Sequence, residues 1–195
     1  MPTQFPQFRV LIAAVATISL IAVLVGAKPS AQTPGPKVGD TAKDFELQSL
    51  SGVKTTLKEA VKTGPVVLVV LRGYPGYQCP LCTKQFGSFL SKADAFKEAK
   101  ATVLFVYPGP ADNLKAHAEE FAKGKTLPAH YVVLLDPDFT FTKAYDLRWE
   151  QKDETAYPST FVIDGKQKIT FAKVSTTHGD RADVADVIKA LPASK

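Results

Sequence analysis

The two cysteines of the chain, Cys79 and Cys82, lie three residues apart, with Pro80 and Leu81 between them. Thiols at this spacing can close a small, strained disulfide that is readily reduced. They follow an apolar run and open a stretch with helical periodicity, and the partial positive charge at a helix N-terminus favours thiolate over thiol. Arg72, shortly before them, would add to that field. The spacing therefore predicts a dithiol that is oxidised and reduced reversibly.

Three other roles for the cysteine pair remain open. The first is a structural disulfide, although a bridge across so few residues restrains the unfolded chain little. The second is a zinc site, which would need two more ligands, whereas His117, His130 and His178 are isolated in the sequence. The third is a copper site that joins both thiolates to the distant His178, because soft thiolates suit Cu(I). The order of strand, CxxC and helix favours redox chemistry over these alternatives.

Three apolar, β-branched runs predict the strands that position the cysteines. They span residues 66–71, 102–107 and 131–136. Continuous apolarity over about six residues, bounded by Gly and Pro, is typical of strands buried on both faces. Two segments with apolar residues at helical spacing separate the runs: Phe86, Phe89, Leu90, Ala93 and Phe96, then Leu114, Ala118, Phe121 and Ala122. This alternation predicts an α/β domain with a parallel sheet covered by helices on both faces.

The last third of the sequence has a different pattern. A short helical segment at 139–145 precedes two apolar runs, 160–164 and 168–174, which meet at an Asp164-Gly165 turn and predict an antiparallel hairpin. The hairpin makes the predicted central sheet mixed. A closing helix follows, for which Asp180 is the predicted N-cap. Its apolar face consists of Val184, Val187, Ile188 and Leu191.

The N-terminal segment reads as an export signal. Residues 10–26 carry no charge, follow Arg9 and lead to Ala27, after which a signal peptidase could cut. The run is also near the shortest length for a membrane helix, so residues 1–27 are either a cleaved signal or a membrane anchor. A Pro-rich linker, 28–37, then leads to one domain, 38–195. Export predicts a periplasmic or extracellular protein, secreted or anchored, in which a disulfide can persist.

Composition excludes several classes of protein. The 195 residues are 45% hydrophobic and 22% charged, which suits one folded domain and not a fibrous or disordered chain. The net charge is +5, but basic residues are scattered among acids and form no stripe interleaved with aromatics. We therefore expect no nucleic-acid partner. The sequence also lacks a Gly-rich phosphate loop and paired carboxylates for acid–base work.

A CxxC between a strand and a helix, followed by a proline just before a later strand and hairpin, resembles the thioredoxin fold. Here that proline is Pro158, in the sequence YPSTFVID. The resemblance implies that the Tyr157–Pro158 bond is cis, that Pro158 lies against the disulfide, and that the flanking backbone binds an extended substrate. A cis bond is uncommon even before proline, so this is a specific expectation.

The start of the domain resembles redoxins of the AhpC/TSA group, which includes peroxiredoxins. The residues that carry this likeness are Gly39, Asp40, Ala42, Asp44, Phe45, Leu47 and Gly52, and the resemblance extends over about 38–191. In the peroxiredoxin motif P-x-x-x-[T/S]-x-x-C, Pro75, Cys79 and Cys82 take the Pro, Thr and Cys positions. The family's active-site Arg position holds Pro158, so the resemblance makes Arg148 or Arg72 its candidate replacement.

The resemblance implies a thiol-dependent antioxidant that reduces peroxides or protein disulfides without a metal or organic cofactor, and the N-terminal segment adds the expectation that it is exported. Its partners would be that substrate and an external thiol or thioredoxin-like reductant. As a peroxidase, Cys82 would attack peroxide and Cys79 would condense with the sulfenic acid. In thioredoxin-like exchange, Cys79 would attack and Cys82 would resolve the mixed disulfide. The alternatives are a protein-disulfide reductase or oxidase without peroxidase activity, a copper-binding carrier, and a redox-inactive interaction module.

Overall fold

The computed structural model describes residues 1–3 and 34–192. The predicted export signal or anchor, apart from residues 1–3, and residues 28–33 of the predicted linker lie outside the described residues. Among the residues that are described, no helix is both long and apolar enough to cross a membrane. The architecture below is that of residues 34–192.

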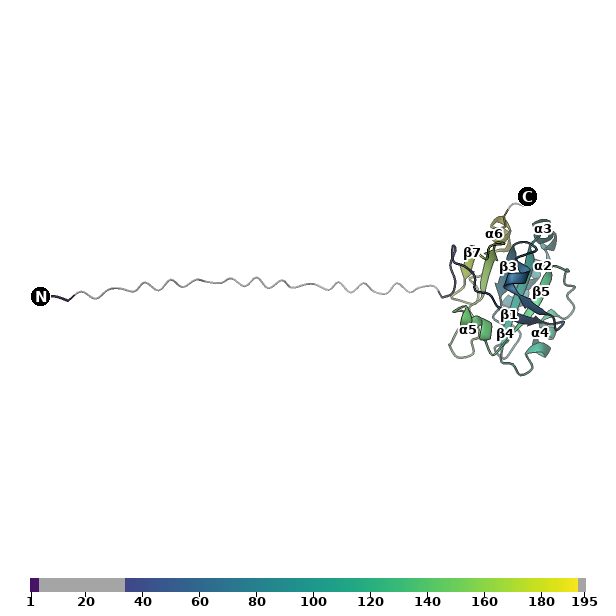
Figure 1. The fold of residues 1–195 in the computed structure, drawn as a ribbon. Helices are drawn as coiled ribbons and strands as arrows, with labels where there is room; N and C mark the ends of the chain where they lie inside the picture. The colour runs from purple at the N-terminus through teal and green to yellow at the C-terminus, as the bar shows by residue number, and fades with distance from the viewer. Residues whose placement is uncertain (4–33, 193–195) are drawn as a thin grey trace. The chain divides into compact units, whose positions relative to one another are not determined.

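A seven-stranded mixed sheet organises this part of the chain (Figure 1). Its strands lie in the order β2 (Lys54–Thr56), β1 (Glu46–Ser49), β5 (Tyr131–Pro137), β4 (Thr102–Gly109), β3 (Val66–Val70), β6 (Ser159–Ile163) and β7 (Ile169–Val174). Strand β4 pairs in parallel with β3 and with β5, and the other neighbours pair antiparallel. The three apolar runs are therefore the parallel centre of the sheet, and the predicted β6–β7 hairpin is confirmed.

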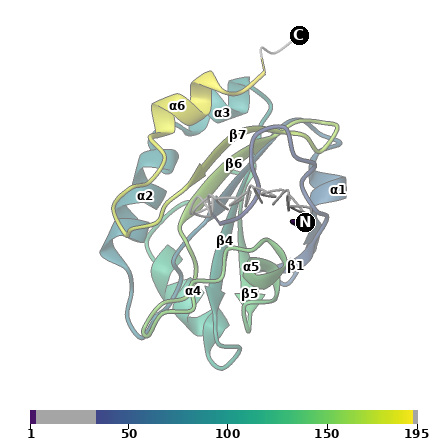
Figure 2. The ribbon, with the colours of Figure 1, turned by 90° about the vertical axis from the view of Figure 1, so that its left-hand side faces the viewer.

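Helices cover both faces of the sheet. One face carries α2 (Pro80–Leu90), α3 (Ala93–Glu98), α4 (Leu114–Ala122) and α6 (Val184–Lys189), and the other carries α1 (Leu57–Ala60) and α5 (Thr140–Ala144). Figure 2 shows α2, α3 and α6 on one side and α1 on the opposite side. Val67 and Val69 of β3 pack with Phe86, whereas Leu68 packs with Leu57, because successive side chains of a strand point to opposite faces. The predicted α/β architecture is confirmed.

The apolar periodicity over 86–96 belongs to two helices. Helix α2 ends at Leu90 and α3 begins at Ala93. At the break, the Ser91 hydroxyl donates a hydrogen bond to the Ser88 carbonyl at 2.8 Å. The Phe89 and Phe96 rings still stack, with centroids 5.5 Å apart. The pattern thus located the buried face correctly but not the break.

The closing helix has a different cap from the predicted one. Asp183 is the N-cap of α6, and its carboxylate accepts a hydrogen bond from the Ala185 N–H at 2.8 Å. Asp180 pairs instead with Lys173, at 2.6 Å. The prediction of Asp180 as the cap is wrong because the helix starts one turn later, at Val184.

Candidate active site

Both cysteines lie at the start of α2, which follows β3 in the chain, at the carboxyl edge of the parallel strands. Cys79 is the N-cap of α2, and its Sγ accepts a hydrogen bond from the Cys82 N–H at 3.4 Å. Pro80 takes the first helical position, where a missing N–H costs no hydrogen bond. Both thiols are free and buried, with 3% of Cys79 and 1% of Cys82 exposed. Both sulfurs are therefore buried at the first turn of α2.

A guanidinium from the far end of the sequence completes the site. Arg181 Nη2 lies 3.8 Å from Cys79 Sγ and 3.6 Å from Cys82 Sγ. Its Nη1 donates to Gln85 Oε1 at 2.7 Å, and its Nε donates to the His178 carbonyl at 2.8 Å. These bonds fix the guanidinium against both sulfurs, so a positive charge is in place where a thiolate forms.

The two sulfurs differ in acidity. The hydrogen bond from the Cys82 thiol is the main cause that lowers the pKa of Cys79 to about 5, in spite of its burial, and the charge of Arg181 and the Leu81 N–H contribute in the same direction. The bond to Cys79, together with burial, raises the pKa of Cys82 well above its ordinary value. The lowered pKa of Cys79 favours its thiolate, which is the reactive form, and the raised pKa of Cys82 favours its thiol.

Arg72 supports the site through its backbone rather than its charge. Its side chain binds elsewhere: Nε lies 2.7 Å from Glu154 Oε2, Nη1 donates to the Tyr77 hydroxyl at 2.6 Å, and Nη2 donates to the Asp153 carbonyl at 2.8 Å. Burial opposes the charge, but the bonds to Glu154 and Tyr77 raise the pKa of Arg72. The Arg72 N–H, in contrast, faces Cys82 and lowers the pKa of that thiol.

Arg148 holds a loop together and contacts neither sulfur. Its Nη1 donates to the carbonyls of Trp149, Glu154 and Thr155, the last two at 2.9 and 2.6 Å. Its guanidinium carbon lies 4.2 Å from the centroid of the Phe139 ring. Of the two arginines proposed to replace the family's active-site Arg, neither brings its charge to the cysteines.

Pro75 lies on the same edge of the sheet but outside the dithiol. It lines a hollow of about 520 Å³ together with Tyr74 and His117, whose rings stack with centroids 3.5 Å apart. Neither cysteine lines this hollow. Pro75 therefore lies in the loop that leads into Cys79, and the hollow that it lines does not include the cysteines.

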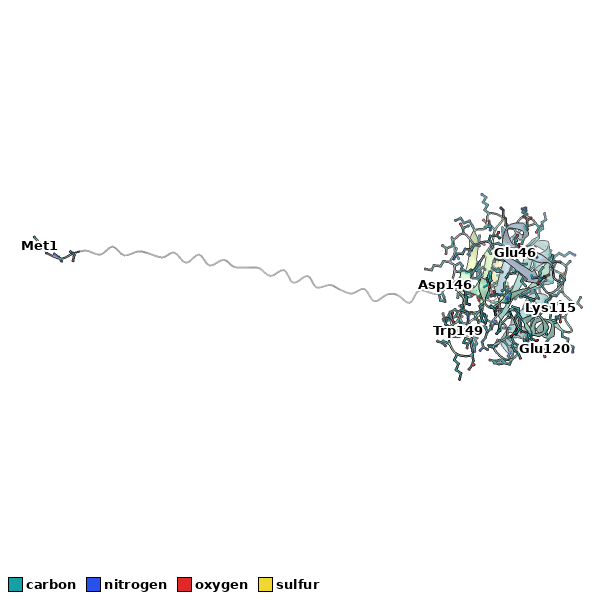
Figure 3. The ribbon with its side chains drawn as sticks, turned by 60° about the horizontal axis from the view of Figure 1, so that its bottom comes forward. Met1, Glu46, Lys115, Glu120, Asp146 and Trp149 are labelled. Carbon is teal, nitrogen blue, oxygen red and sulfur yellow. The ribbon has the colours of Figure 1, made fainter. Side chains whose placement is uncertain are left out.

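The expectation of a cis bond before Pro158 is wrong, since the described residues contain no cis peptide bond. The chain enters β6 in the trans form, which is the lower-energy isomer. The Tyr157 N–H donates to the Leu147 carbonyl, and the Pro158 carbonyl accepts from the Ser175 N–H, both at 2.9 Å. The Tyr157 ring stacks on Trp149, labelled in Figure 3, with centroids 4.8 Å apart. The backbone that would bind an extended substrate is thus already bonded within the fold.

The geometry offers no third ligand to a metal at the cysteines. Within residues 1–3 and 34–192, no group of three or more His, Cys, Asp and Glu side chains is placed to hold a metal ion. His178, which the copper alternative requires, has its Nε2 2.7 Å from Glu154 Oε1. The group that approaches both sulfurs is the Arg181 guanidinium, which repels cations.

Comparison with known proteins identifies the family. The sequence pattern of the AhpC/TSA family matches residues 38–172, more than half of the chain. The chain belongs to the AhpC/TSA family. A Mycobacterium tuberculosis protein whose name classes it with peroxiredoxins is 35% identical over 83 residues, 43% of this chain and 52% of the relative. The chain thus spans about half the length of the first relatives it matches. A 1-Cys peroxiredoxin of Triticum aestivum is 27% identical over 170 residues, 81% of this chain and 74% of the relative.

Solved structures give the same picture. Peroxidoxin BcpB of Mycobacterium tuberculosis matches 80% of this chain and 94% of its own, with 29% identity and a TM-score of 0.59. AhpC of the same organism matches 81% and 92%, with 19% identity and a TM-score of 0.62. The mixed sheet is therefore the thioredoxin-like fold of peroxiredoxins, as the sequence predicted.

The sequence analysis did not identify Arg181, the side chain that contacts both sulfurs. The arginine lies 99 residues after Cys82, between Asp180 and Asp183, and belongs to no recognised motif. Gln85, which holds it, was missed for the same reason. The proline at the family's arginine position was the one available signal that an arginine had to come from elsewhere. That signal could not say which arginine.

Proposed function

We propose that this chain is a thiol peroxidase that uses Cys79 and Cys82 as a single redox couple. The observation that carries the proposal is the placement of both sulfurs at the start of α2 with Arg181 Nη2 3.8 Å from Cys79 Sγ and 3.6 Å from Cys82 Sγ. The pKa of Cys79, lowered to about 5, agrees with this placement. A thiolate at neutral pH is the form that attacks peroxide. Membership of the AhpC/TSA family and the peroxiredoxin relatives support peroxide as the substrate.

The proposed cycle oxidises the two thiols by two electrons. The Cys79 thiolate attacks one oxygen of a hydroperoxide, the O–O bond breaks, and the departing alkoxide or hydroxide takes up a proton. Cys79 is then a sulfenic acid. The Cys82 sulfur, losing its proton, attacks the Cys79 sulfur and displaces the oxygen as water, which leaves the Cys79–Cys82 disulfide. An external thiol returns the pair to its reduced state.

This order gives Cys79 the first attack, whereas the motif match assigned that step to Cys82. The pKa values support the new order, because Cys82 is the protonated partner. Both cysteines are buried, with 3% of Cys79 and 1% of Cys82 exposed, so burial does not distinguish them and the order rests on the pKa directions.

Burial also favours a peroxide over a protein disulfide as the substrate. Only 3% of Cys79 is exposed, which admits a small molecule more readily than a folded partner. In addition, the backbone around Pro158 is occupied by bonds to Leu147 and Ser175. An extended peptide would have to break those bonds before it could lie beside the cysteines.

The proposal includes export of the protein. The uncharged run at 10–26, preceded by Arg9, supports an export signal or anchor. The intact mass of the protein recovered from membrane and secreted fractions tests this directly. A chain that begins after Ala27 supports cleavage, a full-length chain in the membrane fraction supports an anchor, and a full-length chain found only in the cytosol overturns export.

The test of function is peroxide consumption with dithiothreitol as reductant, for wild type, Cys79→Ser and Cys82→Ser. We expect Cys79→Ser to abolish consumption. In a separate reaction with peroxide and no reductant, we expect Cys82→Ser to accumulate a sulfenic acid on Cys79 that dimedone traps and mass spectrometry locates. Consumption that survives Cys79→Ser but not Cys82→Ser would restore the order implied by the motif. Rapid insulin reduction with peroxide ignored would overturn the peroxidase itself.

A further inference from the structure

A second hollow, of about 340 Å³, lies beside the dithiol, between α2 and the segment that leads into α6. Its volume is in the range of small-molecule sites. Leu81, which separates the two cysteines, lines it, together with Lys84 and Gln85 of α2. Arg181 lines it from the other side. Neither cysteine lines this hollow, but Arg181, which does, has its Nη2 3.8 Å from Cys79 Sγ and 3.6 Å from Cys82 Sγ, so the hollow adjoins the dithiol through that side chain.

Three charged side chains line the hollow: Lys84, Arg181 and Asp183. Lys84 is exposed and takes part in no ion pair in the part of the chain that the structure describes. The Asp183 carboxylate accepts a hydrogen bond from the Ala185 N–H at 2.8 Å. Two neighbouring charges cancel within pairs, Asp180 with Lys173 and Glu154 with Arg72. The hollow is left with two cations and one carboxylate.

Oxidation of the dithiol changes this balance. In the reduced protein the Cys79 thiolate offsets the excess positive charge, because it lies 3.8 Å from Arg181. A disulfide is neutral, so its formation removes the anion while Lys84 and Arg181 keep their charges. The hollow is thus near neutral in the reduced state and positive in the oxidised state, which is the state that a reductant must recognise.

We propose that this hollow binds the reductant of the enzyme, and that it selects a small thiol carrying a further negative group such as a carboxylate. Arg181 attracts the thiolate of the reductant, and Lys84 attracts its second anionic group. Favourable charge at a binding site raises the rate of encounter. The inference rests on the dithiol cycle proposed above and names the class of molecule that closes it.

The reduction proceeds in two exchange steps. The thiolate of the reductant attacks the Cys79 sulfur, forming a mixed disulfide and releasing Cys82, which takes up a proton. A second reductant thiolate then attacks the reductant's sulfur in the mixed disulfide and releases Cys79 as a thiolate. Two small thiols become one small disulfide, and the two cysteines gain the two electrons. Arg181 stabilises the leaving Cys79 thiolate, since a low-pKa thiol leaves faster.

The test uses three small thiols that differ in charge: 3-mercaptopropionate, 2-mercaptoethanol and cysteamine. The Cys79–Cys82 disulfide is first formed with diamide, and its reduction is followed by alkylation and intact mass. Each rate is divided by the rate of the same thiol on bis(2-hydroxyethyl) disulfide, which removes differences in pKa and nucleophilicity. We expect mercaptopropionate to be fastest and cysteamine slowest, with a span of about tenfold at low ionic strength, which salt reduces.

Lys84→Glu and Lys58→Glu form a matched pair of variants. Both change the net charge equally at an exposed helix position, but Lys58 lies on α1, on the opposite face of the sheet. We expect Lys84→Glu to abolish or reverse the order of the three thiols and Lys58→Glu to leave it unchanged. Equal normalised rates in the wild type, or equal effects of the two variants, would overturn the inference.

The same experiment separates this inference from the proposed function. If diamide forms the disulfide but peroxide does not, the peroxidase proposal fails while the charge preference is still measured. If peroxide forms the disulfide and the three thiols reduce it alike, the peroxidase stands and the reductant site fails.

Discussion

Two arginines approach the active-site loop, and they differ in what surrounds their charge. Arg72 is 3% exposed and is matched by the carboxylate of Glu154, a side chain that is 10% exposed, at 2.7 Å. Arg181 binds the neutral oxygens of Gln85 and His178, and its other contacts are the two sulfurs. Within the described residues no carboxylate pairs with it. The charge of Arg72 therefore belongs to the fold, whereas that of Arg181 is available to an anion.

This difference explains why proximity in sequence was a poor guide to function. Arg72 stands seven positions before Cys79 but is neutralised within its own pair. A salt bridge in the interior loses much of its favourable energy to desolvation, so it is a weak source of stability but a costly one to break. A cation without a carboxylate partner, in contrast, acts on whatever thiolate forms beside it. The two arginines can be separated by experiment.

Removal of Arg72 should have the largest effect, and on stability. Arg72→Met leaves Glu154 buried with only His178 as a partner, so we expect a loss of about 3 to 5 kcal/mol in the free energy of unfolding. Urea denaturation measures it. The double variant Arg72→Met/Glu154→Gln removes the uncompensated charge and should regain part of the loss. A loss below about 1 kcal/mol would contradict the assignment of Arg72 to the fold.

The reactivity of Cys79 should depend on pH in a way that an ordinary thiol does not. Its pKa of about 5 predicts alkylation by iodoacetamide at a constant rate above about pH 6, falling about tenfold per unit below about pH 5. Because the folded pKa lies below the unfolded one, the thiolate stabilises the reduced protein. This stabilisation is complete above the unfolded pKa, about 8.5, and is lost as pH falls through about 5. Alkylation that still accelerates above about pH 8 would contradict the low pKa.

Replacement of Arg181 should move that pH profile rather than unfold the protein. Arg181→Gln removes a positive charge 3.8 Å from Cys79 Sγ, and we expect the pKa of Cys79 to rise by about one to two units. The midpoint of iodoacetamide alkylation against pH measures it. Arg181→Lys keeps the charge and should restore most of the shift. An unchanged midpoint in Arg181→Gln would show that the hydrogen bond from Cys82 suffices alone.

The fold was largely predictable because its central strands are apolar on both faces. The runs at 66–71, 102–107 and 131–136 gave the parallel strands, and the Asp164-Gly165 turn gave the hairpin. The pair β1 and β2 was missed, since strands of four and three residues with mostly polar side chains carry little pattern. Short elements at a sheet edge are specified by their neighbours more than by their own sequence.

The site was predictable only where it is local in sequence. Cys79 and Cys82 can be recognised by their spacing. The positive charge beside them belongs to Arg181, which only the tertiary structure brings near. The cis form of Pro158 was expected from resemblance, but the bond is trans, and the backbone on either side of it is hydrogen-bonded to Leu147 and Ser175. Contacts across about 100 residues leave no trace in a single sequence unless a motif records them.

Loss of the His178 side chain should have the smallest effect, and it tests whether the two arginines are independent. His178 Nε2 bonds Glu154, the partner of Arg72, while the His178 carbonyl accepts from Arg181 Nε. His178→Ala removes the first bond and keeps the second. The side chain is 42% exposed, so we expect a loss of about 0.5 to 1 kcal/mol in urea denaturation.

The second expectation for His178→Ala is an unchanged alkylation midpoint for Cys79, since the carbonyl still holds Arg181. In a Glu154→Gln background the loss of stability caused by His178→Ala should be smaller, because Glu154→Gln already weakens the bond between residues 154 and 178. A midpoint shifted by a full unit would mean that the pair with Glu154 positions the whole segment that carries Arg181. The charge of Arg72, which stabilises the fold, and the charge of Arg181, which acts on the Cys79 thiolate, would then be coupled through His178. The two arginines would not be independent.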